Sequence, residues 1–163
     1  RAVRRLRPDL AEADLDALAR LAEGSAGRAF TLLDHGGVEL HRELLAMLGM
    51  FPRIDDVALD RLSDRLGRAG AEDGFRVFAA MLTNLLARLC RDQRAGRIGR
   101  AGADDAESPV VQALARAAGL DRWLQVWEKL AELFARAEGA KLDRKQVVVD
   151  AVLTLAQAAR GRA

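Results

Sequence analysis

Arg28 stands at a position where an anion could bind. It follows Gly24-Ser25-Ala26-Gly27, in which Gly24 can end one helix and Ser25 can cap the next. Arg28 then falls in the first turn of that second helix, where unpaired backbone N–H groups attract phosphate. A plain helical corner with a solvent-exposed arginine explains the same residues, so the spacing alone leaves both interpretations open.

Other motifs for catalysis or metal binding are missing from the sequence. There is no Gly-Lys pair and therefore no Walker A phosphate loop. His35 and His41 lack the cysteine or carboxylate spacing of a zinc site. No Ser/His/Asp arrangement is placed by its neighbours. We therefore expect no metal, no cofactor and no catalysis within this chain, and no binding or hydrolysis of ATP by this chain alone.

A run of arginines spaced by threes could contact a phosphate backbone. The run consists of Arg88, Arg91, Arg94, Arg97 and Arg100. The same pattern fits a basic helix C-terminus, which the helix dipole favours, followed by a solvated loop. Acidic residues lie nearby in sequence, and no aromatic residue is interleaved to stack on bases. DNA contact within this chain is therefore not expected.

Length and composition describe one ordinary domain, or a small domain with an appendage. The chain has 163 residues, of which 50% are hydrophobic and 4% aromatic, and its net charge of +2 does not indicate nucleic-acid binding. The single cysteine, Cys90, excludes an intramolecular disulfide and fits a reducing compartment. No apolar run approaches a membrane span, and no signal peptide is recognisable. We expect a cytoplasmic protein, and Arg1 indicates that the chain is a fragment.

Apolar periodicity and the positions of glycine and proline predict an all-α protein. Helices are expected at about 11–23, 25–34, 38–48, 56–66, 71–95, 108–118, 121–138 and 143–159. Asp55 or Asp56, Asp121 and Asp143 are expected to cap the helices that follow them. The β-branched run 147–149 could indicate a strand, but the helical pattern that continues beyond it outweighs this. The Gly36-Gly37 pair is the expected domain boundary.

Side-chain spacing predicts both a core and a partner surface. The long helix carries a bundle seam at Phe75, Phe78, Leu82, Leu85 and Leu89. Trp123 and Trp127 are expected in the core, so Trp127→Ala should cost roughly 3–5 kcal/mol. Five further apolar residues widen the apolar arc beyond what one bundle interior can cover, and we expect them at a partner interface: Val77, Met81, Leu86, Val147 and Val149.

Two segments carry a resemblance to a known family. Residues 21–34, with Gly24-Ser25-x-Gly27-x-Ala29, resemble the lid of bacterial clamp-loader AAA+ subunits. Residues 142–152, in which Asp143 precedes Arg144 and Asp150 lies in an aliphatic run, are similar to the last helix of the collar in that family. The expected helix order also looks like the family's, and the delta prime subunits of DNA polymerase III are the most similar members.

The resemblance implies a short helical lid remnant at 1–36, followed by a six-helix collar at 37–163. In that family the collar assembles a pentameric loader that places the sliding clamp on primed DNA, so the expected partners are the gamma/tau and delta subunits. Arg28 matches the sensor-2 position of the family. Because delta prime subunits commonly lose nucleotide binding, the resemblance implies that this role of Arg28 is vestigial. For Ser25 and Gly27 it implies structural roles. Two alternatives remain open: the collar of the ATP-hydrolysing gamma subunit, and a self-contained helical ligand-binding or dimerisation domain of a regulator.

Overall fold

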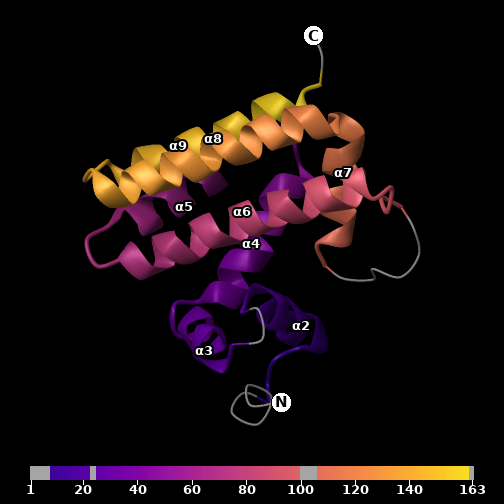
Figure 1. The fold of residues 1–163 in the computed structure, drawn as a ribbon. Helices are drawn as coiled ribbons and strands as arrows, with labels where there is room; N and C mark the ends of the chain where they lie inside the picture. The colour runs from indigo at the N-terminus through magenta and orange to yellow at the C-terminus, as the bar shows by residue number, and fades with distance from the viewer. Residues whose placement is uncertain (1–7, 23–24, 100–105, 162–163) are drawn as a thin grey trace.

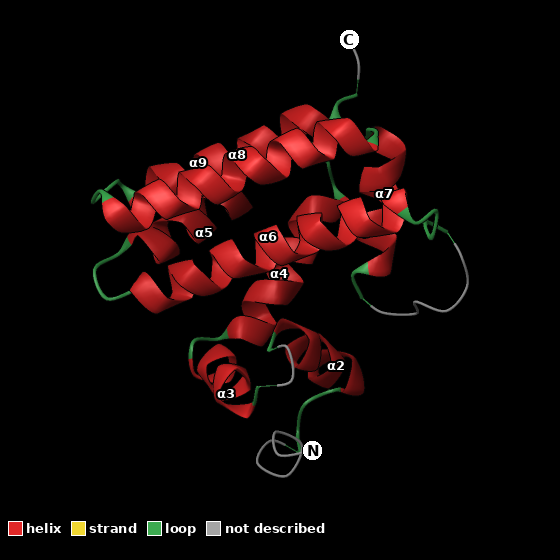
Figure 2. Cartoon of the chain, viewed as in Figure 1, coloured by secondary structure: helices red, strands yellow, loops and turns green. Residues whose placement is uncertain are grey.

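The computed structural model describes residues 8–22, 25–99 and 106–161, and every regular element in these ranges is a helix (Figure 2). The predicted all-α class is therefore confirmed. The helices are α2 (Glu12–Leu21), α3 (Ala26–Asp34), α4 (Gly37–Gly49), α5 (Asp56–Gly67), α6 (Glu72–Arg94), α7 (Ser108–Ala117), α8 (Leu120–Gly139) and α9 (Arg144–Ala159). The expected helix end at Gly24 lies outside the described residues.

Local capping explains where several helices begin. Ser25, Asp55 and Asp143 each accept a hydrogen bond from a backbone N–H of the helix that follows, as predicted. The predicted cap at Asp121 is wrong, because α8 begins one residue earlier and Asp121 lies within its first turn. The β-branched run 147–149 is helical, so tertiary packing overrides its strand preference.

Helices α5 to α9 form the larger part of the molecule (Figure 1). Helix α6 lies beside α8, and the two run in opposite directions. Helix α9 packs against α5, α7 and α8. Helices α2 and α3 form a smaller group at one end, and α4 runs from that group into the bundle, contacting α2 and α3 as well as α6 and α7.

The expected domain boundary falls on a tight turn rather than on a linker. Gly36 has a φ of 66°, a conformation that glycine adopts without strain. A Cβ on Gly37 would lie 2.5 Å from the carbonyl oxygen of Leu32, so only glycine fits there. Across the turn, Arg42 of α4 pairs with the buried Asp14 of α2. The group formed by α2 and α3 therefore packs directly on α4.

The end of α5 lies very close to the beginning of α9. A Cβ on Gly67 would approach the Cβ of Lys145 to 2.8 Å. The guanidinium of Arg144 donates to the carbonyl oxygens of Leu66, at 3.3 Å, and of Arg68, at 2.7 Å. These carbonyls belong to the C-terminal turn of α5 and its flank, where intrahelical donors are lacking. Arg144, in the first turn of α9, thus supplies hydrogen-bond donors to the carbonyl groups at the end of α5.

The predicted seam of α6 is confirmed, since all five of its residues are buried. Phe134 of α8 packs edge-on against two of them, Phe75 and Phe78, with ring centroids 6.1 Å apart in both pairs. Such edge-to-face contacts add to the energy of simple burial. The α6–α8 contact is therefore a specific part of the core.

The expectation of a partner surface at the five additional apolar residues is wrong for four of them. Val77, Met81, Leu86 and Val147 are only 1–7% exposed, and Val149 is half-buried. The reason is that α6 packs against α4, α5, α7 and α8 around its circumference, while α9 packs against three helices. A wide apolar arc here reflects many neighbours within the same chain.

The two tryptophans differ in burial, contrary to the expectation that both are core residues. Trp123 is 0% exposed, whereas Trp127 is 36% exposed. Trp127 lies one helical turn further along α8 and rotated toward the edge of the α6–α8 contact. The expected cost of 3–5 kcal/mol for Trp127→Ala assumed full burial, so a smaller cost is now expected.

Candidate functional site

The corner between α2 and α3 holds the residues that the sequence singled out. Ser25 Oγ accepts from the backbone N–H of Arg28 at 3.4 Å, and Thr31 Oγ1 donates to the carbonyl of Gly27 at 3.1 Å. Arg28 is exposed in the first turn of α3. The structural roles expected of Ser25 and Gly27 fit this geometry, and the side chain of Arg28 lies at the surface of the group formed by α2 and α3.

A buried ionic cluster joins α4, α6 and the start of α7. Its members are His41, Arg88 and Glu107, which we call the His41–Arg88–Glu107 cluster. Glu107 Oε1 lies 2.9 Å from His41 Nε2, and Glu107 Oε2 accepts from Arg88 Nη1 at 2.9 Å. Arg88 also donates to Ser108 Oγ at 3.1 Å. Both carboxylate oxygens are engaged, so the cluster fastens three helices together.

The pKa of Glu107 follows from its surroundings. Burial raises the pKa of this carboxyl group, but the hydrogen bonds from His41 and Arg88 and the nearby positive charges lower it further, so the pKa lies below its ordinary value. Glu107 therefore remains ionised inside the protein at neutral pH. A buried carboxylate is tolerated here because it is paired and hydrogen-bonded.

We expect the Glu107 carboxylate to stabilise the fold at neutral pH and to lose this effect in acid. Its pKa in the folded state is lowered from about 4.5, so its contribution is complete above pH 4.5 and is lost as the pH falls through the folded-state value. Glu107→Gln should therefore be less stable than wild type at pH 7, with the difference shrinking below pH 4.5. Urea unfolding between pH 7 and pH 3 measures this, and a difference that does not change with pH would contradict it.

Sequence reasoning missed this cluster. His41 and Glu107 are 66 residues apart, and only the fold brings them together. One local signal was present, because His41 has helical spacing with Leu44 and Leu48, two inward-facing residues. A histidine on that stripe needs a buried partner, but the sequence does not show which residue provides it.

The arginines of the run that the structure describes, Arg88 to Arg97, do not form a continuous basic surface. Arg88 is partly buried and pairs with Glu107, and Arg97 pairs with Asp92 at 2.9 Å. Arg91 and Arg94 are exposed near the end of α6. Arg100 lies outside the described residues. The expectation that this run is mainly structural agrees with the pairing of Arg88 and Arg97.

An open face between α6 and α8 carries exposed apolar side chains. We define the α6/α8 face by two shallow hollows that meet at Trp127. One, of about 220 Å³, is lined by Ala87, Cys90, Arg91, Arg94, Leu120, Leu124 and Trp127. The other, of about 370 Å³, includes Ala79, Ala80, Thr83, Ala131 and Ala135. Leu124 is 39% exposed and Trp127 36% exposed.

A second set of exposed apolar residues lies on α5 and α9. Val57 is 62% exposed and Leu153 38% exposed, and the half-buried Val149 lies one turn before Leu153. Helices α5 and α9 pack extensively against each other. We call these three residues the α5/α9 surface. A partner could bury them without disturbing the core.

No protein-family model, curated protein or solved structure that was compared with the chain matches it. Among the helices in the described ranges, none is long and apolar enough to cross a membrane. Within the same residues, no three His, Cys, Asp or Glu side chains are grouped so that they could hold a metal ion.

Proposed function

We propose that this chain is the end of an AAA+ lid followed by the collar of a clamp-loader subunit of the delta prime type. The observation that carries the proposal is the helix order: a two-helix group with a Ser25-capped corner, a Gly36-Gly37 turn, and six helices including the long α6. The similarity of residues 21–34 and 142–152 to that family supports the same assignment. The function is non-catalytic assembly of the loader that places the sliding clamp on primed DNA.

In this proposal Arg28 occupies a vestigial sensor-2 position. Its exposure at the start of α3 leaves it accessible to whatever lies against the lid. The nucleotide site to which sensor 2 belongs would lie in another part of the protein. Arg28 therefore carries no catalysis within this chain.

The α5/α9 surface is the contact that we propose for the gamma/tau and delta subunits. Four of the five residues expected at this interface are buried, which leaves Val149 together with the exposed Val57 and Leu153. Exposed apolar residues on two packed helices are typical of a surface that another protein covers. Both helices belong to the predicted collar.

Co-purification tests the proposal. The chain should bind the gamma and delta subunits of the same organism, and Leu153→Glu combined with Val57→Glu should weaken the complex at least about tenfold, because two charges would be buried without partners. Gln125→Glu is the control for an added charge, since Gln125 is exposed on α8, outside the α5/α9 surface. It should leave binding unchanged.

Absence of binding at tens of micromolar, with the chain folded, would contradict the clamp-loader assignment and favour a regulator domain. Met81→Glu is unsuitable as an interface variant, because Met81 is 2% exposed and the substitution would destabilise the fold.

A further inference from the structure

The α6/α8 face exposes side chains that usually form the centre of an interface. Trp127 is the ridge between its two hollows, and Leu124 lies beside it. More than a third of each side chain remains in contact with water. Tryptophan is enriched among the residues that dominate binding energy, because a partner can remove a large apolar area from water at little entropic cost.

Small residues beside Trp127 make room for another helix. On α6 they are Ala79, Ala80, Thr83 and Ala87, and on α8 they are Ala131 and Ala135. Short side chains allow two helices to approach closely, as ridges of one fit grooves of the other. The face is therefore shaped for helical packing.

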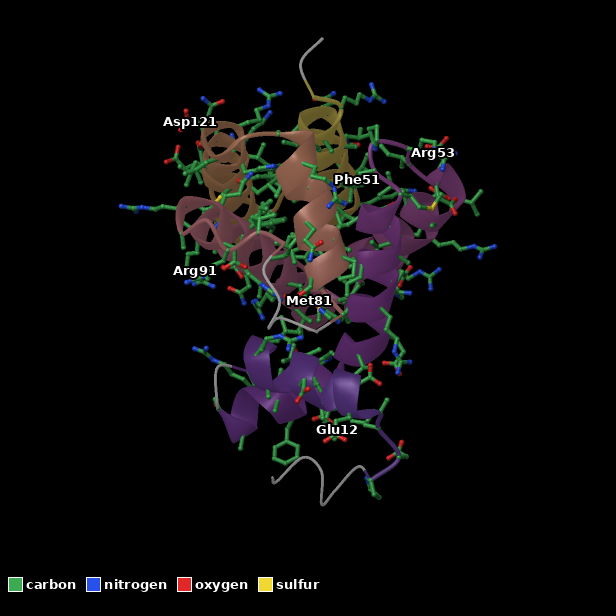
Figure 3. The ribbon with its side chains drawn as sticks, turned by 90° about the vertical axis from the view of Figure 1, so that its right-hand side faces the viewer. Glu12, Phe51, Arg53, Met81, Arg91 and Asp121 are labelled. Atoms are coloured by element: carbon green, nitrogen blue, oxygen red, sulfur yellow. The ribbon has the colours of Figure 1, made fainter. Side chains whose placement is uncertain are left out.

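The two edges of the face carry opposite charges. Arg91 and Arg94, both exposed, lie on the α6 edge. On α8, Asp121 and Glu128 are exposed, and each directly follows a residue that lines the hollow, so they share one outer edge two turns apart. Figure 3 shows Arg91 and Asp121 on the same side of the molecule, away from Arg53.

We propose that the α6/α8 face binds a second copy of this chain, with the two copies related by a two-fold axis parallel to these helices. Such a rotation places α6 of one copy over α8 of the other. It does not change the position of any residue along the direction of the helix axes. It therefore places the basic edge of each copy over the acidic edge of the other. A two-fold contact uses each complementary pair twice.

The positions of the charged residues along the helix axes determine which ion pairs form between the two copies. Arg91 shares a hollow with Leu124 and Trp127, so in the dimer it reaches Glu128 of the other copy. Arg94 lies at the level of Leu120 and reaches Asp121 of the other copy in the same way. The Trp127 side chains lie over the small residues Thr83 and Ala87. Apolar centre and charged rim together have the usual anatomy of an interface.

The size of the face sets the expected affinity. Helix α8 has 20 residues, so two such helices side by side present about 600 Å² per copy. A total near 1,200 Å² is at the lower limit for specific complexes, so we expect a weak dimer and test it at micromolar concentrations. The α6/α8 face is separate from the α5/α9 surface, so self-association is tested without any other subunit.

Sedimentation of the 163-residue chain between about 2 and 200 µM tests the proposal. A monomer–dimer equilibrium is expected, and Trp127→Ala should weaken it about thirtyfold as a hot-spot residue. A chain that stays monomeric over the whole range overturns the proposal. So does a dimer that Trp127→Ala leaves unchanged.

Charge reversal tests the two-fold geometry. The variant Arg91→Glu/Arg94→Glu and the variant Asp121→Arg/Glu128→Arg should each lose self-association at least tenfold, while a mixture of the two should form a heterodimer. Arg53→Glu/Arg61→Glu, which reverses two exposed arginines elsewhere, is the control and should dimerise like wild type. Absence of a heterodimer in the mixture, or equal weakening by the control, overturns the proposed arrangement.

Discussion

Replacing Trp123 with alanine is expected to lower the free energy of unfolding by about 3–5 kcal/mol. The side chain is 0% exposed. Its indole N–H donates to the carbonyl oxygens of Leu114 at 3.0 Å and Ala118 at 3.1 Å, at the end of α7. The substitution would therefore leave a large cavity and remove the bond that holds α7 to α8. Urea denaturation at protein concentrations below the micromolar range measures the effect on the monomer.

Trp127→Ala is the matched comparison, because it removes the same side chain one turn away. Trp127 is 36% exposed and donates no comparable bond to α7, so its loss should cost only about 1–2 kcal/mol. Equal losses at the two positions would show that their difference in burial does not govern stability.

Arg88→Met is the other substitution for which a large effect is expected. Methionine retains most of the aliphatic volume but removes the guanidinium that pairs with Glu107 at 2.9 Å. Glu107 would then be a buried carboxylate that has lost its guanidinium partner, at a cost of about 3 kcal/mol at neutral pH. Thermal or urea unfolding at pH 7 measures it.

Arg91→Met provides the control, since Arg91 is exposed on the same helix. It should change monomer stability by no more than about 0.5 kcal/mol. In the Arg88→Met background, Glu107→Gln should recover part of the loss, because it removes the uncompensated charge. If it adds a further loss instead, the cost of Arg88→Met does not come from the buried carboxylate.

The helices were predictable because their signals are local. Helix-period apolar residues lie between glycines and capping side chains, and three of the predicted caps form as expected. Asp121 misled the prediction because an aspartate in the first turn is favourable as well, through the helix dipole. Without the backbone geometry, the sequence does not show whether such an aspartate is the N-cap residue or lies in the first turn of the helix.

The tertiary partners were not predictable from periodicity. The apolar arc of α6 was interpreted as too wide for one bundle interior, which wrongly placed Val77 and Met81 at a partner interface, whereas helices of this chain bury both. The spacing also placed Trp123 and Trp127 on one seam, although Trp123 lies against the end of α7 and is buried, whereas Trp127 is exposed. Side-chain direction relative to a neighbour is a property of the packed pair of helices.

The contact between the end of α5 and the beginning of α9 has a consequence for biosynthesis. Leu66 and Arg144, which meet there, are 78 residues apart in the chain. At about 5–20 residues per second, the ribosome needs roughly 4–16 s to make the intervening segment. During that interval the apolar side of α5 has no α9 to cover it. The nascent chain therefore passes through a period in which chaperones or aggregation compete for a surface that the finished protein conceals.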